Sequence, residues 1–350
     1  MLNSLFVSGL AVALLTLIAW GVRTLPSERW QMLAAIPLSK GPDGSWRGLN
    51  LTFYGFFSAT GTAFGFVIML LLLGSVGAPV SLSVLLMIVV LLVCIPASRL
   101  IASLVERKRN TFTVAGAAFA ATMILPWIIL IARPLVARWL NREISVLPAL
   151  AAMAIAYVFG ESIGRLACLS FGCCYGMPLR DANRRVARLF RNHNLVISGS
   201  TKKAAYASGL AGEPLVPVQA ITSVLFAGSG IVGLALFLNQ EFRLAALIPV
   251  LVSWGWRACS EWLRADYRGT WRISMYQLMA VVSAAYLGVF LAFIPAAAPT
   301  IPDLAGGFSQ LTSVPVLLMV QFLWIGLFLY YGRSRVTAST LSFHVVTDGI

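Results

Sequence analysis

Runs of apolar residues long enough to cross a lipid bilayer are the feature that most constrains this chain. A helix rises about 1.5 Å per residue, so about 20 apolar residues cross the roughly 30 Å hydrocarbon layer. The runs are continuous rather than alternating, which argues against a β-barrel. We expect nine membrane-spanning helices, at residues 5–22, 53–73, 80–105, 112–131, 146–169, 217–238, 244–263, 273–293 and 315–331.

Composition supports the same fold class and excludes several others. Hydrophobic residues make up 59% of the 350 residues and charged residues only 11%, with a mean hydropathy of +0.87. An ordinary soluble domain carries about 25% charged residues, and a nucleic-acid module needs a polar body. The sequence therefore predicts an all-α polytopic membrane helical bundle with no soluble domain. No basic residue precedes the first run, so we expect a retained anchor helix rather than a cleaved signal peptide.

The basic residues are distributed unevenly between the two sides of this bundle. The net charge is +14. If the runs alternate across the membrane, one side holds 20 Lys and Arg and the other holds four. The positive-inside rule would make the basic side cytoplasmic. Its longest polar segment, about 177–216, is rich in arginine. The spacing of these arginines is typical of a basic amphipathic helix that lies on anionic lipid. It is equally typical of a solvated loop helix.

Charged residues inside the spans are costly and usually functional. Arg99 stands alone in the third run. Glu161 and Arg165 lie four residues apart and can pair on one helical face. Near the end of the seventh run, Arg257, Glu261 and Arg264 share another face. Arginines grouped at one depth favour a phosphate-binding pocket, because a guanidinium makes two parallel charge-assisted hydrogen bonds. The alternative is a set of internal salt bridges.

Three of the five cysteines, Cys168, Cys173 and Cys174, lie close together in the sequence. Their spacing differs from that of common zinc motifs, and histidines are few, so we expect no metal and no cofactor. The thiols have three other possible roles. They can be buried and inert, disulfide-bonded in an oxidising compartment, or reactive beside Arg165.

Glycines flank the same segment at regular intervals. Gly160 and Gly164 fit the small-xxx-small pattern of close helix packing. Gly172 and Gly176 instead favour a tight turn at the end of the span.

Residues 164–176 and four other segments resemble the motifs of a known protein family. Residues 164–176 read Gly-Arg-Leu-Ala-Cys-Leu-Ser-Phe-Gly-Cys-Cys-Tyr-Gly. This resembles the signature of the prolipoprotein diacylglyceryl transferase family, Gly-Arg-x-Gly-Asn-Phe-x-Asn-x-Glu-x-x-Gly. Four other segments resemble family motifs in the same order: Phe53-Tyr54-Gly55, Val216-Pro217-Val218-Gln219, Arg257-x3-Glu261-x2-Arg264-x-Asp266 and Ile273-Ser274-Met275-x-Gln277. The resemblance covers about residues 50–295.

The chain also departs from the family pattern. Cys168 and Phe171 replace two asparagines of the signature, and Cys173 replaces its glutamate. Val216 replaces the histidine of His-Pro-x-Gln, and the family's His-Gly-Gly segment corresponds to Val114-Ala115-Gly116. The arginines that would face a phosphate are therefore kept, whereas the histidines and the Asn and Glu groups are not.

The resemblance implies a seven-helix transferase-like core at 46–300, with an anchor helix and linker at 1–45 and an extra helix and tail at 301–350. It implies transfer of the diacylglyceryl group of phosphatidylglycerol to the lipobox cysteine of a prolipoprotein, in the bacterial inner membrane. The expected catalytic residues are Tyr54, Arg165, Arg257 and Glu261, with Glu261 orienting Arg257. The expected substrate-binding residues are Arg99, Gly164, Cys168, Gly172, Cys173, Tyr175, Gly176, Gln219 and Arg264.

Two alternatives remain open at the level of sequence. One is a related transferase that uses an anionic phospholipid with another acceptor. The other is a non-catalytic lipid-binding or assembly protein. Orientation is also open, because the resemblance places the site in the periplasm and the positive-inside rule places it in the cytoplasm. No nucleic-acid partner is expected.

Overall fold

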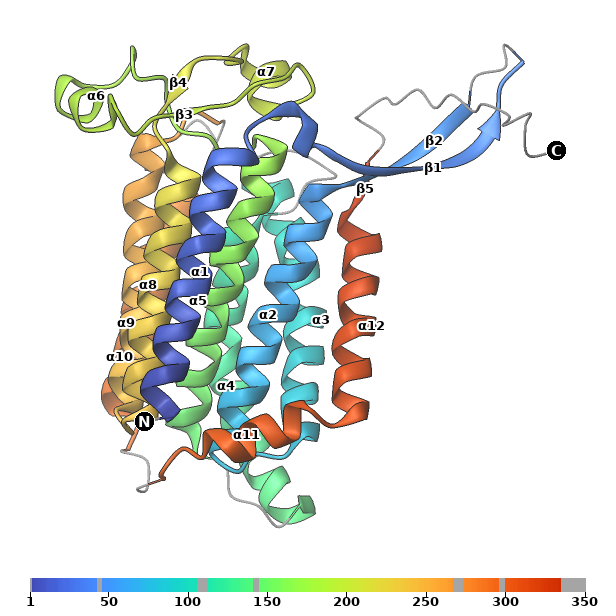
Figure 1. The fold of residues 1–350 in the computed structure, drawn as a ribbon. Helices are drawn as coiled ribbons and strands as arrows, with labels where there is room; N and C mark the ends of the chain where they lie inside the picture. Colours follow the sequence, from blue (N-terminus) through green and yellow to red (C-terminus); the bar gives the residue numbers. More distant parts are fainter. Residues whose placement is uncertain are drawn as a thin grey trace.

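The computed structural model describes residues 2–42, 46–105, 113–140, 145–266, 273–295 and 300–334. Long helices run side by side, and a polar layer covers one end of the bundle (Figure 1). The long helices are α1 (Leu2–Thr24), α2 (Phe53–Ser75), α3 (Val80–Val105), α4 (Val114–Leu140), α5 (Val146–Phe171), α8 (Val218–Leu238), α9 (Phe242–Ser260), α10 (Met275–Phe293) and α12 (Val314–Tyr331).

The predicted all-α membrane bundle is confirmed. Within the described residues, eight of these helices are long and apolar enough to cross a membrane. The exception is α9, which corresponds to the expected run 244–263. It carries Arg243 and Arg257 within 19 residues and packs against α5, α8 and α10. It ends at Ser260, where a 3-10 turn (Glu261–Leu263) follows, so its last expected residues are not α-helical.

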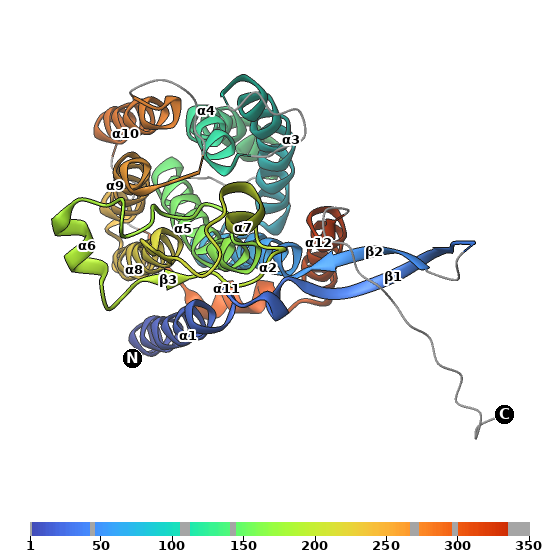
Figure 2. The ribbon, with the colours of Figure 1, turned by 90° about the horizontal axis from the view of Figure 1, so that it is seen from above.

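Helix α5 is the centre of the bundle. In its most apolar stretch, 78% of residues are buried, against 17% for α1 and 11% for α12. Helices α2, α8 and α9 pack on it, while α1 and α12 lie towards the outside (Figure 2). Close packing of α2 on α5 requires glycine. A Cβ atom on Gly61 would lie 2.5 Å from the carbonyl oxygen of Gly160. The packing role predicted for Gly160 is confirmed.

The polar end of the bundle collects the segments expected there from the alternation of spans. The link after α1, the long segment between α5 and α8, and the turn after α9 all lie at this end (Figure 1). Several basic residues counted in the sequence lie outside the described residues, among them Arg142, Arg268 and Arg272. So does the tail at 335–350.

A β-hairpin at the polar end was not predicted. Strands β1 (Met32–Lys40) and β2 (Trp46–Thr52) pair in antiparallel fashion, and β5 (Arg333–Ser334) adds a short third strand beside β2. The hairpin extends sideways beyond the helices (Figure 2). The sequence Gly41-Pro42-Asp43-Gly44 between the strands is a turn signal that would have indicated it.

The polar segment 177–216 is folded into short elements. They are α6 (Arg184–Phe190), β3 (Leu195–Val196), α7 (Lys203–Ser208) and β4 (Pro214–Leu215). The basic helix expected here is only seven residues long, capped by the side chain of Asn183. At the opposite end of the bundle, α11 (Leu304–Leu311) packs against α2.

Candidate functional site

A cavity of about 400 Å³ lies inside the bundle between α2, α3, α4, α5 and α9. Apolar side chains form most of its wall. Its polar lining includes Tyr54, Tyr157, Glu161, Arg165 and Cys168, and four of these five residues belong to α5. The cavity is therefore apolar over most of its length, with ionised groups gathered on one helix.

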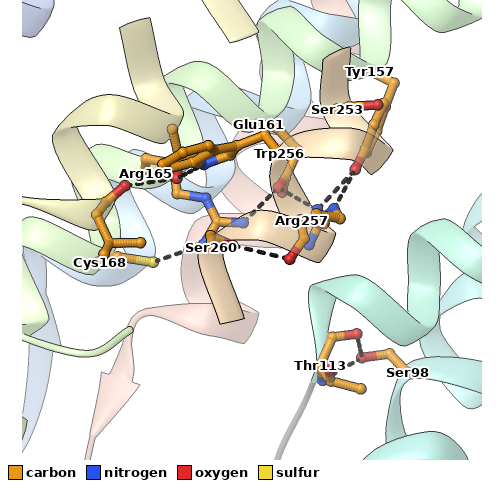
Figure 3. Close-up of polar contacts among 12 residues, drawn as sticks. Ser98, Thr113, Tyr157, Glu161, Arg165, Cys168, Ser253, Trp256, Arg257 and Ser260 are labelled. Atoms are coloured by element: carbon orange, nitrogen blue, oxygen red, sulfur yellow. Dashed lines mark hydrogen bonds and ion pairs between the residues drawn. The ribbon is translucent and has the colours of Figure 1, made fainter. Parts of the chain in front are cut away.

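Glu161 is the centre of the charged cluster. Its Oε2 atom accepts a hydrogen bond from Arg165 Nη2 at 2.8 Å and another from Arg257 Nη2 at 2.7 Å. Figure 3 shows this carboxylate between the two guanidinium groups, which come from α5 and α9. All three side chains are 8–13% exposed. Two cations thus share one anion inside the bundle.

Arg257 is held from several directions. Its Nε and Nη2 atoms donate to the hydroxyl of Tyr157 at 3.2 and 2.7 Å. Its guanidinium also lies 5.7 Å from the ring centre of Trp254 and 6.0 Å from that of Phe226, within reach of cation–π attraction. The side chain is therefore fixed in place before any ligand arrives.

The partner of Arg257 differs from the one predicted. The spacing of Arg257 and Glu261 favoured a pair within one helix, but α9 gives way to a 3-10 turn at Glu261. Glu261 instead accepts a hydrogen bond from Ser274 Oγ at 3.0 Å. The prediction that Glu261 orients Arg257 is therefore wrong, and Glu161 has that position.

The cluster has one positive charge in excess, and part of its hydrogen-bonding capacity is unused. Arg165 Nη1 lies 3.9 Å from Cys168 Sγ. Its Nε atom is buried and has no hydrogen-bond partner among the described residues. A buried donor without a partner costs about 1–3 kcal/mol. The arrangement therefore suits an anion that supplies an acceptor to Arg165.

Arg264 lies beside this cluster because two chain segments pair near the end of α5. Gly176 and Arg264 form an antiparallel bridge, and Met177 N donates to Leu263 O at 2.8 Å. On the other side, a Cβ atom on Gly176 would lie 2.2 Å from the carbonyl oxygen of Val216, so only glycine fits. Arg264 donates two hydrogen bonds of 2.8 Å to Asp266, and these charges neutralise each other.

The three clustered cysteines surround the end of α5. Gly172 caps the helix with φ +70°, the left-handed turn predicted from the sequence. Cys174 also has a positive φ, +56°, which is strained for a residue with a side chain. The turn brings the sulfur atoms of Cys168, Cys173 and Cys174 within 4.8 Å of one another, and all three thiols are free. Of the described His, Cys, Asp and Glu residues, only these three gather closely enough to hold a metal ion.

The electrostatic environment of this cluster favours a thiolate. Hydrogen bonds with Cys168 and Cys173, followed by the charges of Arg264 and Arg165, hold the pKa of Cys174 well below its usual range. Hydrogen bonds with Cys168 and Cys174, followed by burial, raise the pKa of Cys173. The pKa values of neighbouring thiols are therefore shifted in opposite directions within this group.

The remaining predicted residues fall into two sets. Tyr54 lines the cavity and packs on Phe171, with ring centres 5.5 Å apart. Gly164 lines the cavity, and Gln219 donates to Cys173 O at 2.9 Å. Two other predicted residues, Tyr175 and Arg99, make their contacts away from the cavity. Tyr175 is hydrogen-bonded to Ser208 at 2.6 Å, and Arg99 contacts the hydroxyl of Tyr330 in α12.

Sequence reasoning missed the role of Tyr157 and the double role of Glu161. Tyr157, Glu161 and Arg165 follow one another at intervals of four, and Cys168 comes three residues later. This spacing places all four on one face of α5. The pattern was visible in the sequence, but the pairing of Glu161 with a second helix was not.

No known protein-family model matches the chain. No curated protein matches its sequence either.

Proposed function

We propose that the protein is a membrane transferase that moves the diacylglyceryl group of an anionic phospholipid, phosphatidylglycerol, to the cysteine thiol of a lipoprotein precursor. The observation that carries this proposal is the apolar cavity whose lining includes Arg165 and Glu161, the carboxylate that Arg165 shares with Arg257. A phospholipid has the same division into an apolar body and an anionic head. The motif resemblance around Arg165 and Arg257 supports the same reaction.

The proposed reaction requires a cation beside the phosphate, because negative charge develops on the phosphate oxygen as it leaves. The sulfur of the acceptor thiolate forms a bond to a glycerol carbon of the lipid, and the bond from that carbon to the phosphate oxygen breaks. Glycerol-1-phosphate leaves with the electron pair. Arg165 and Arg257 stabilise the leaving phosphate, since preorganised donors act most strongly on charge that forms in the transition state. The unpartnered Nε of Arg165 is the first donor available to a phosphate oxygen.

The acceptor needs no protein histidine in this scheme. Nearby cations lower the pKa of a thiol, so the acceptor cysteine ionises beside Arg165 and Arg257 and its proton passes to water. The protein's own thiols are not suited to act as the nucleophile. A thioether formed on them would be a poor leaving group and would end the reaction. The cysteine cluster is therefore not assigned the role of nucleophile.

The test is transfer of radiolabelled diacylglyceryl from phosphatidylglycerol to a peptide that contains a lipobox cysteine. Product should require the peptide's cysteine, and Arg165→Gln should reduce transfer by at least about 100-fold, as removal of one transition-state donor does. Arg180→Gln is the matched control, because Arg180 is exposed and pairs with Glu213. Full activity in Arg165→Gln would exclude the phosphate-binding role.

A second candidate, a non-catalytic lipid-binding protein, is favoured by the position of Glu161. This carboxylate already accepts hydrogen bonds from both guanidinium groups, so fewer donors remain to stabilise the charge that develops in a transition state. Stoichiometric bound phospholipid without turnover in the same assay would favour this candidate. Release of the lipid headgroup without labelling of the peptide would instead indicate another acceptor.

Orientation follows from the acceptor. Precursor cysteines are exported, so the polar end of the bundle should face the periplasm. Two exposed positions at opposite ends, Ser200 and Asn239, provide a matched pair for cysteine substitution. In a background whose native cysteines are replaced by serine, a membrane-impermeant thiol reagent should label Ser200→Cys but not Asn239→Cys in intact cells. The reverse pattern would place the site in the cytoplasm.

A further inference from the structure

Cys168, Cys173 and Cys174 are not the nucleophile of the proposed transfer, although they lie beside its arginines. We propose that these three thiols form a binding site for a single soft metal ion, copper(I). The inference rests on the geometry of the three sulfur atoms and does not depend on the proposed function.

The distances suit three-coordinate binding. A metal–sulfur bond of about 2.3 Å to each of three sulfurs in one plane sets those sulfurs about 4.0 Å apart. The three sulfur atoms lie within 4.8 Å of one another. An inward movement of less than about 1 Å would therefore complete the site, which side-chain rotation of Cys173 and Cys174 in the turn after α5 can supply.

The donor set selects the metal. Thiolates favour soft ions such as copper(I) and zinc, but structural zinc is almost always bound by four ligands. No histidine or carboxylate among the described residues joins the three thiols. The nearest carboxylates are engaged, Glu161 by two arginines and Asp266 by Arg264. Copper(I) is satisfied by three thiolates alone.

The surrounding charges balance such a complex. Three thiolates and one copper(I) ion carry a net charge of −2. Arg264 and Arg165 lie close to Cys174, and Lys203 lies close to Cys173 and Cys174. Asp266 neutralises Arg264, so the positive charge left beside the thiols is that of Lys203 and the excess charge that Arg165 and Arg257 share around Glu161. Such cations would be unfavourable beside a bare metal ion, but they stabilise an anionic metal–thiolate unit. This explains why a group of thiols and a group of cations occupy the same end of the bundle.

The surroundings of the three cysteines hold them in place and leave the site open to an ion. Gln219, itself 1% exposed, donates to the carbonyl oxygen of Cys173, and its own Oε1 atom is buried with no hydrogen-bond partner among the described residues. Cys174 is held at φ +56°, a conformation that persists only when the surroundings impose it. Cys168 is buried while Cys173 and Cys174 are partly exposed, so an ion can reach the site from the polar end.

The test uses the purified, reduced, full-length protein in detergent, with no lipid substrate. Competition between the protein and bathocuproine for copper(I) should show one bound ion per chain. X-ray absorption should show three sulfur neighbours at about 2.3 Å. Cys173→Ser and Cys174→Ser should each weaken binding by more than the roughly 10–100-fold that loss of an outer-shell partner costs.

Cys259→Ser is the matched control, because Cys259 is exposed and lies outside the cluster. It should bind copper(I) as tightly as the wild type. Absence of copper(I) binding by the helical, monodisperse wild-type protein would overturn the proposal. So would binding of equal strength when all three cluster cysteines are replaced by serine. Because the readout is metal content and coordination, a failed transfer assay leaves this result unaffected.

Discussion

The arginines of the bundle interior and those of the polar segment 177–216 carry the same charge but occupy opposite environments. Arg165 and Arg257 are nearly buried and share Glu161. The arginines of the polar segment are exposed, and those without an ion pair to a described residue are Arg184, Arg185, Arg188 and Arg191. The arginines at these two places therefore form a small, fixed set and a larger, solvated set.

The difference shows where charge is costly and where it is not. A charge removed from water must be neutralised and hydrogen-bonded, so each interior arginine has a carboxylate within 2.8 Å. An exposed arginine needs no such partner because water solvates it. Interior charges are thus suited to bind a ligand at a defined point. The exposed charges act as a field over a surface.

The largest expected effect comes from removing the shared carboxylate. Glu161→Gln leaves two guanidinium groups close together without a counter-charge, and loss of one partner of a buried ion pair costs about 3–5 kcal/mol. We expect the free energy of unfolding, measured by titration with denaturing detergent, to fall by about 3 kcal/mol.

Glu213→Gln is the matched control for this prediction. Glu213 pairs with the exposed Arg180, also at 2.8 Å, and an exposed pair contributes at most about 1 kcal/mol. Equal losses in the two variants would mean that water screens the interior cluster as well. If phosphatidylglycerol restores stability to Glu161→Gln more than to the wild type, the two arginines bind the phosphate.

The sequence predicted the bundle better than it predicted the site. Long apolar runs can do little other than span the bilayer, so eight of the nine expected helices were recovered as apolar spans. The partners of buried charges depend on how helices face one another. Spacing within one helix correctly paired Glu161 with Arg165, but no local pattern could reveal that Arg257 reaches across from α9. The three thiols likewise come together only through the turn at Gly172.

Lys202 is a third kind of cation, which is buried and forms no ion pair with a carboxylate of the described residues. It is fully buried at the start of α7, and its Nζ atom donates to the carbonyl oxygens of Leu25 at 3.0 Å and of Ser170. These bonds tie the ends of α1 and α5 to the polar segment. Lys202→Met would leave two buried acceptors unpaired, and we expect a loss of about 1–3 kcal/mol in the free energy of unfolding. The exposed Lys40→Met should change it by less than about 0.5 kcal/mol.

The same lysine gives a pH dependence. Burial lowers the pKa of Lys202 to about 8, from 10.5 when exposed. Between these values the unfolded chain holds more protons than the folded one, so this group increases stability as the pH rises. We therefore expect the stability of the wild type, relative to Lys202→Met, to increase from pH 8 to pH 10.5. A constant difference across this range would mean that Lys202 remains solvated.

The smallest effect on stability is expected from the exposed set. Replacing Arg184, Arg185 and Arg188 of α6 by glutamine removes no ion pair among the described residues, so the free energy of unfolding should change by less than about 0.5 kcal/mol. Lipid binding should respond instead, because each basic residue near an anionic surface contributes about 1 kcal/mol to binding.

The measurement is the rise in melting temperature when nanodiscs of neutral lipid are replaced by nanodiscs containing phosphatidylglycerol. That rise should shrink in the triple variant and in high salt, since salt screens exposed charges but not buried ones. An unchanged rise would assign the lipid preference to the interior arginines alone, and α6 would then be a solvated loop helix.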